Sequence, residues 1–234
     1  LHGEGSGCAS AWIRSRRLKS AMVEKEGFAA LVLRLRGEGI SDLDLLTAVE
    51  QTPRSKFVPP QFAADAYSSR TIPIDCGSFM EGADMAVKIL ARLQLKPGQR
   101  VLEIGTGSGF MTAIIARRVE RVFSLERYKT LVQQAQNCLD DLAIRNVVIR
   151  QADGSNGLVG EGTFDRIVST AAFTTMPRFF AEQIVSGGMM IAPIIVEGDR
   201  CVMTRFSKTG SRFEKEELFE APYLPLSTHI ARHL

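Results

Sequence analysis

Long apolar runs, cysteine and excess charge are all scarce in this chain. No apolar run approaches the ~20 residues that a membrane-spanning helix needs. The four cysteines, Cys8, Cys76, Cys138 and Cys201, form neither a C-x-x-C pair nor a zinc-binding spacing, which favours a reduced, cytoplasmic setting. The net charge of +3 is too small to indicate binding to nucleic acid or to an anionic membrane. We therefore expect a soluble protein whose partners are neither membranes nor nucleic acids.

Length and composition are those of an ordinary globular protein. The 234 residues, 45% hydrophobic and 24% charged, are enough for one α/β core and an appended segment. Residues 1–21 differ from the rest, because they mix small residues with arginine and lysine. We expect a disordered tail there, left by a cloning vector, by upstream read-through or by a basic targeting segment, with Met22 as the natural start.

Residues 101–110 are the stretch on which the rest of the interpretation depends. Val101–Ile104 has the apolar character of a buried strand, three glycines at alternate positions follow, and a helical pattern begins at Phe110. Strand, glycine turn and helix form the nucleotide-binding corner of a doubly wound sheet, where glycines let the backbone approach a ligand. The spacing is G-x-G-x-G, whereas a turn that cradles a pyrophosphate has G-x-G-x-x-G. The turn therefore favours a ligand other than a dinucleotide.

Acidic side chains at three strand ends narrow the choice of ligand. Glu103 lies beside the glycine turn, where a carboxylate would oppose a phosphate but suits an amine or a sulfonium cation. Glu126 ends the next strand about 20 residues further on, where an acid can hold a ribose diol. Asp153, followed by Gly154, ends a third strand and is placed to reach an adenine amino group. Together they predict S-adenosylmethionine as the cofactor, with S-adenosylhomocysteine as the product.

Strand and helix patterns alternate through most of the chain. The predicted fold class is α/β, a Rossmann-like doubly wound sheet that is mostly parallel, with an antiparallel hairpin at its end and an N-terminal helical extension. Ligands of such sheets bind at the carboxyl ends of the strands, where the three acids fall. The expected elements include a helix from Val23 to Gly37, a helix capped by Ser41, a loop over 72–83, a helix over Pro177–Val185, a strand from Met189 and a hairpin turn at Lys208–Gly210.

Several motifs occur in a fixed order between residue 22 and about residue 228. They are Thr52–Pro59, similar to "VPRexFVP"; Ile72–Ile74, similar to "LPI"; Val101–Phe110, similar to "VLEIGTGSGY"; Asp153–Gly154, similar to "GDG"; and Tyr223–Leu226, similar to "FVPL". In this order they resemble the protein-L-isoaspartate O-methyltransferase family, which implies a class I methyltransferase acting on isoaspartyl residues of protein or peptide substrates. The cofactor contacts implied by the resemblance are Glu103, Gly105, Thr106, Gly107, Gly109, Glu126, Arg127, Asp153, Gly154 and Thr170.

The loop over residues 75–81 departs from the family. Family members read roughly "GHGQTIS" there, with the last serine assigned to catalysis, whereas this chain reads Asp-Cys-Gly-Ser-Phe-Met-Glu. Glu81 stands at the place of that serine, and Ser78 takes its role if the loop is shifted. An ionised Glu81 within ~4 Å of an acceptor carboxylate would cost about 1 kcal/mol in water and about 4 kcal/mol at an effective dielectric constant of about 20. A neutral or cationic acceptor, with Glu81 as its base, would suit this loop better.

Glu81 and Ser78 are accordingly the candidate catalytic residues. The leading function is methylation of isoaspartyl residues; the alternatives are a diverged methyltransferase for another acceptor, with Glu81 as base, and a cofactor-binding protein without catalysis. No metal is expected, because His229 and His233, although spaced i, i+4, resemble a solvated tail. Residues 22–83 would form the helical extension and substrate loop, and residues 84–234 the S-adenosylmethionine-binding domain.

Overall fold

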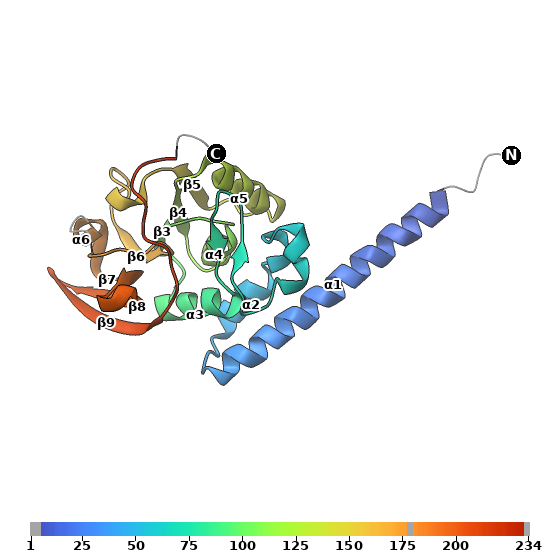
Figure 1. The fold of residues 1–234 in the computed structure, drawn as a ribbon, viewed down its shortest axis with the longest axis horizontal. Coiled ribbons are helices and arrows are strands. Elements are labelled where there is room, and N and C mark those ends of the chain that lie inside the picture. Colours follow the sequence, from blue (N-terminus) through green and yellow to red (C-terminus); the bar gives the residue numbers. More distant parts are fainter. Residues whose placement is uncertain (1–5, 177–179, 232–234) are drawn as a thin grey trace.

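The computed structural model describes residues 6–176 and 180–231, and in this part of the chain seven strands form one sheet (Figure 1). In spatial order the strands are β5 (Val147–Gln151), β4 (Arg121–Glu126), β3 (Arg100–Ile104), β6 (Phe164–Ser169), β7 (Ile184–Ile195), β8 (Cys201–Thr209) and β9 (Arg212–Glu220). The pairs from β5 to β7 are parallel, and β8 and β9 add antiparallel pairs. The predicted fold class, with its closing hairpin, is confirmed.

The central strand β3 is covered on both faces. Its register places Leu102 beside Phe123 of β4 and Ile167 of β6. Leu102 and Ile104 belong to one core cluster, and Val101 belongs to a second one that includes buried residues of the helices over Ala83–Leu93 and Phe110–Ala116. Because alternate side chains of a strand point to opposite faces, a near-continuous apolar run is what a strand buried on both sides requires.

Helices cover the sheet and extend beyond it. They are α1 (Ser6–Gly37), α2 (Leu43–Glu50), α3 (Ala83–Leu93), α4 (Phe110–Ala116), α5 (Lys129–Asp141) and α6 (Phe180–Gln183), with short 3-10 turns at Arg54–Lys56, Pro60–Asp65, Gly154–Asn156 and Glu197–Asp199. Every residue of α4 is buried, which holds the turn before it against the core. Within the described residues, none of the helices combines the length and the apolar character that crossing a membrane would take.

The N-terminal helix is longer than the sequence pattern indicated. It begins at Ser6 instead of near Val23, so residues 6–21, expected to be a disordered tail, continue the helix, and α1 extends away from the rest of the fold (Figure 1). The physical reason is composition, because residues 8–26 contain neither glycine nor proline and are rich in helix formers. The next helix, α2, is capped by Asp42 and not by Ser41, since the Asp42 carboxylate accepts a hydrogen bond from the Leu45 amide at 3.0 Å.

Two further elements differ from expectation. The loop over 72–83 contains a small antiparallel pair, β1 (Ile72–Pro73) and β2 (Phe79–Met80). The helix expected over Pro177–Val185 is confined to α6 among the described residues, and residues 177–179 lie outside them. Strand β7 begins at Ile184, before the glycine pair, because Ile184 pairs with Phe164 and the register then shifts as Gly187 adopts a positive φ of 80°. A glycine in this conformation lets the strand continue through an irregularity that the sequence pattern indicated as a turn.

Candidate active site

A cleft open to solvent lies at the carboxyl ends of β3, β4, β5 and β6, with an empty volume of about 870 Å³. The predicted site residues that line it are Ser78, Glu81, Gly105, Gly107, Glu126, Arg127, Gly154 and Thr170. Four others, Glu103, Thr106, Gly109 and Asp153, are not among its lining residues. The sheet therefore brings most of the predicted set to one edge, as expected from its parallel strands.

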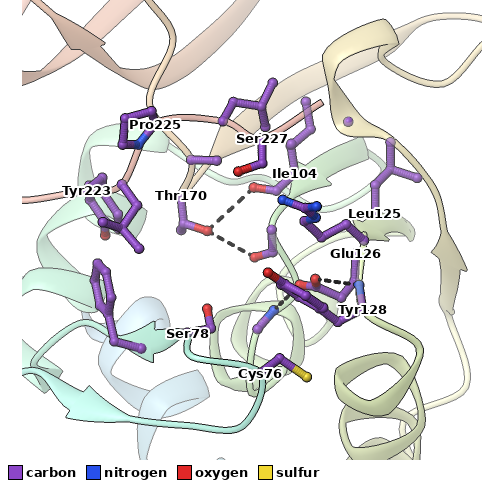
Figure 2. Close-up of a pocket in the computed structure, with 18 of the residues that line it drawn as sticks. Cys76, Ser78, Ile104, Leu125, Glu126, Tyr128, Thr170, Tyr223, Pro225 and Ser227 are labelled. Carbon is purple, nitrogen blue, oxygen red and sulfur yellow. Dashed lines mark hydrogen bonds between the residues drawn. The ribbon is translucent and has the colours of Figure 1, made fainter. Parts of the chain in front are cut away.

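The glycine turn after β3 has no space for a side chain at its first position. Gly105 has a φ of +95°, and a Cβ atom there would lie 2.4 Å from the Thr170 Oγ1 atom. Thr170 follows β6, and its hydroxyl donates to the carbonyl of Gly105 at 3.0 Å and approaches that of Ile104 at 3.5 Å (Figure 2). The turn and the end of β6 are thus held together, and the backbone of the turn faces the cleft.

Glu126, at the end of β4, lies next to the glycine turn and lines the cleft. Its carboxylate accepts hydrogen bonds from the backbone amides of Gly107 and Tyr128, each at 3.0 Å (Figure 2). These amides hold the two oxygens in place, and each carboxylate oxygen still has capacity for a further donor. The arrangement suits a ligand that presents a pair of hydroxyl groups.

Glu103 lies behind the turn instead of in the cleft. Leu102 and Ile104 point to one face of β3, so Glu103 points to the other and meets α4. One carboxyl oxygen accepts from the hydroxyls of Thr112 at 2.5 Å and Ser124 at 2.6 Å. The other oxygen has no hydrogen-bond partner among the described residues. Burial raises the pKa of Glu103 to about 7, against the opposing effect of the two hydroxyls.

Thr106 and Gly109 also hold the turn from behind. The Thr106 hydroxyl lies 2.6 Å from that of Ser124, next to the Glu103 carboxyl. Gly109, at a φ of +84°, precedes α4, and a Cβ atom there would lie 2.9 Å from the Cβ atom of Ala135. These predicted contact residues therefore shape the turn without lining the cleft.

Asp153 after β5 is engaged by the C-terminal segment. Its two oxygens accept from the backbone amides of Ser155, at 2.8 Å, and His229, at 2.6 Å. Burial alone would raise the pKa of Asp153, but the amide donors outweigh it and the pKa is lowered. The Ala231 amide donates in turn to the Arg127 carbonyl at 3.2 Å. The C-terminal segment is thus fastened next to the cleft, and His233 lies outside the described residues.

The same segment forms one wall of the cleft. After β9 the chain crosses the end of β6, where Ala172 exchanges backbone hydrogen bonds with Leu224, at 2.8 Å, and Leu226, at 2.7 Å. Residues 223–227 consequently line the cleft opposite the β1–β2 loop, with Ser78 and Thr170 on two sides of the same space (Figure 2). The "FVPL"-like motif was the available signal for this wall, although the sequence alone assigned it no role.

Glu81 follows the β1–β2 pair and meets two residues that sequence reasoning left out. The Tyr223 hydroxyl donates to the Glu81 carboxyl at 3.4 Å, and the buried Arg54 guanidinium donates to the Glu81 carbonyl. Burial raises the pKa of Glu81, although the charge of Arg54 acts in the opposite direction. The signal for Arg54 was its place in the "VPRexFVP"-like motif. Neither Glu81 nor Ser78 has a histidine beside it among the residues that line the cleft.

The fold and the cleft together define a Rossmann-like methyltransferase of the S-adenosylmethionine-dependent class. The profile of the protein-L-isoaspartate(D-aspartate) O-methyltransferase family matches residues 26–231. A protein-L-isoaspartate O-methyltransferase of Rhizobium meliloti is 55% identical over 204 residues, which are 87% of this chain and 100% of that protein. The chain belongs to the protein-L-isoaspartate(D-aspartate) O-methyltransferase family.

Further relatives agree with this assignment. A protein-L-isoaspartate O-methyltransferase of Maricaulis maris is 38% identical over 204 residues, covering 87% of this chain and 95% of that protein. A crystal structure from Plasmodium falciparum, described as a protein-L-isoaspartate O-methyltransferase in complex with S-adenosyl-L-homocysteine, has a TM-score of 0.74 and 26% sequence identity. It matches 85% of this chain and 97% of its own. The family resemblance seen in the sequence is confirmed.

Proposed function

We propose that this protein transfers a methyl group from S-adenosylmethionine to the free carboxylate of isoaspartyl residues in proteins and peptides. The observation that carries the proposal is that the residues proposed to bind the cofactor and those proposed to bind the acceptor line the same cleft. An open glycine turn with Glu126 beneath it lies on one side, and the loop bearing Ser78 and Glu81 lies on the other. Membership of the family supports the choice of acceptor.

The residues of the cleft fit this cofactor. The Glu126 carboxylate has capacity for the two ribose hydroxyls, and the turn at Gly105 exposes backbone where a side chain would collide with Thr170. Ile104 and Leu125 provide apolar surface for a base. The cofactor supplies a methyl group on a sulfonium centre. The chain's own part is to orient that group, to hold the acceptor against it and to exclude water.

The chemistry demands little of the protein beyond positioning. An α-carboxyl group has a pKa of about 3.5, so the acceptor is already an anionic nucleophile at neutral pH and needs no base. Methylation would convert the acceptor carboxylate into a neutral ester. Ser78 would donate a hydrogen bond to the acceptor, and its position in the lining of the same cleft as Thr170 supports this role (Figure 2).

A second candidate is a methyltransferase for a hydroxyl or amine acceptor. The raised pKa of Glu81, caused by burial, favours it, because a carboxylate with a raised pKa is a stronger base. Cytoplasmic residence is also part of the proposal, supported by the free thiols of Cys76, Cys138 and Cys201.

The test is radiolabelled methyl transfer to an isoaspartyl peptide, with the normal aspartyl peptide as control and cofactor binding followed by calorimetry. Label should enter the isoaspartyl peptide alone. Glu126→Ala should weaken cofactor binding at least tenfold. The control is Glu120→Gln, which changes an exposed carboxylate directly before β4 and should leave cofactor binding unchanged. Cofactor binding with no transfer to the isoaspartyl peptide would refute the proposed acceptor. Transfer to a hydroxyl or amine acceptor would then support the second candidate, and transfer to none would indicate a non-catalytic binding protein.

A further inference from the structure

Glu81 is a carboxyl group in the lining of the cleft that the proposed acceptor carboxylate would enter. It is half-buried, it lines the cofactor cleft, and it also lines a small adjoining pocket with Phe79 and Tyr223. The Tyr223 ring stacks on that of Phe79 with 6.4 Å between centroids, which fixes the hydroxyl that reaches Glu81. The position of this carboxyl group is therefore defined by its surroundings.

The charged and titratable groups that face Glu81 come from three elements. Arg54, from the 3-10 turn Arg54–Lys56 that precedes the β1–β2 pair, is fully buried and donates to the Glu81 carbonyl. None of the described residues accepts from its Nε and Nη1 atoms, and burial lowers its pKa to about 10, so it remains a cation at neutral pH. Tyr223, from the C-terminal segment, is buried and its pKa is raised, so it stays neutral. Glu103, from β3, is the third group, and the charge of Glu81 contributes to the raised pKa of Glu103.

One cation cannot fully balance two carboxylates in this space. Arg54 offsets the charge of Glu81 while the acceptor subsite is free. An entering acceptor carboxylate would add a second negative charge, and repulsion between the two carboxylates at ~4 Å would weaken acceptor binding at least several-fold. Protonation of one of the two carboxyl groups would remove this repulsion, as in other sites where carboxylates share a small volume. The acceptor, with its pKa of about 3.5, is the weaker base and stays ionised.

We propose that Glu81 binds the acceptor carboxylate as a neutral carboxylic acid, so that acceptor binding takes up one proton. This inference rests on the proposed function, since it requires a carboxylate acceptor. The proton comes from solvent to Glu81, which donates a hydrogen bond through it. The acceptor oxygen then forms its bond to the methyl carbon as the bond from carbon to sulfur breaks, and Glu81 keeps its proton. Release of the neutral ester returns that proton to solvent.

The decisive experiment is the pH dependence of KM for an isoaspartyl peptide at saturating cofactor. Neither the acceptor nor the methyl transfer takes up a proton between about pH 6 and about pH 9, so a slope there reports an enzyme group. In the wild type, KM should rise with pH, by up to about tenfold per pH unit above the pKa of Glu81. In Glu81→Gln, which keeps a neutral donor of the same shape, KM should be independent of pH. Asp75→Asn removes an exposed carboxylate from the same loop and should retain the wild-type slope.

A second readout does not need turnover. Calorimetry of the isoaspartyl peptide binding to the S-adenosylhomocysteine complex, in buffers of different ionisation enthalpy and at a pH above the pKa of Glu81, should give an uptake approaching one proton for the wild type and none for Glu81→Gln. Glu81→Ser, with the family's residue, should behave like Glu81→Gln and replaces it if that variant fails to fold. A wild-type slope retained in these variants, or a KM that falls as pH rises, would overturn the inference. Absence of methyl transfer and of peptide binding at every pH would instead refute the proposed function.

Discussion

The buried carboxyl group of Glu103 should make the protein less stable as pH rises, and Glu103→Gln should remove this effect. The side chain is fully buried, and one of its oxygens has no hydrogen-bond partner among the described residues. Its pKa is raised from an ordinary 4.5 to about 7 because burial disfavours the carboxylate. Glutamine has the same shape, can accept from Thr112 and Ser124 through its oxygen, and does not titrate.

The sign and size follow from proton linkage. The unfolded chain loses the Glu103 proton near pH 4.5, whereas the folded chain holds it until pH reaches about 7. The stabilising contribution is therefore complete below the unfolded pKa and is lost as pH rises through the folded pKa. The difference between the unfolded and folded pKa values of Glu103 corresponds to about 3 kcal/mol of unfolding free energy, since each pKa unit is worth about 1.4 kcal/mol.

The assay is urea unfolding of both proteins without cofactor, from about pH 4.5 to about pH 8. Other groups titrate alike in the two proteins, so the difference between their unfolding free energies isolates position 103. Glu103→Gln should gain about 3 kcal/mol relative to the wild type across this range. A difference that stays constant with pH would show that Glu103 is ionised in the folded protein, and the argument from its burial would be wrong.

Three further changes test the turn and its surroundings. Gly105→Ala should lower stability by about 1–3 kcal/mol and abolish cofactor binding in calorimetry. The control is Gly98→Ala, at a position with a φ of +81° and nothing within 4 Å of a Cβ atom, which should lower stability through backbone strain without loss of cofactor binding. Thr112→Val removes a donor to Glu103 and should shift the stability transition to higher pH, whereas an unshifted transition would contradict the assigned hydrogen bond. A chain ending at Ser227 lacks the His229 amide, so the pKa of Asp153 should rise in an NMR titration; an unchanged pKa would mean that the tail does not hold Asp153 in solution.

The sequence alone determined the sheet and the location of the cleft. The glycine turn after Val101–Ile104 and the acids at the strand ends are local features, encoded within a few residues. Parallel strands bring their carboxyl ends to one edge, so these features meet without any knowledge of packing. This is why the fold class was predictable, and why Glu126 and Gly105 line the cleft as expected.

Tertiary structure alone decided which acids face the cleft and what surrounds the acceptor. Glu126 ends β4 and Glu103 is the last residue but one of β3. Strand alternation directs the Glu103 side chain toward α4, behind the glycine turn and away from the cleft. Asp153 accepts a hydrogen bond from the His229 amide, 76 residues away in the sequence. Glu81 accepts one from the Tyr223 hydroxyl, 142 residues away. No local pattern carries such contacts, because they depend on how the C-terminal segment crosses the finished sheet. The charge state of Glu81 follows from that packing, since desolvation and the buried Arg54 act on it only in the folded chain.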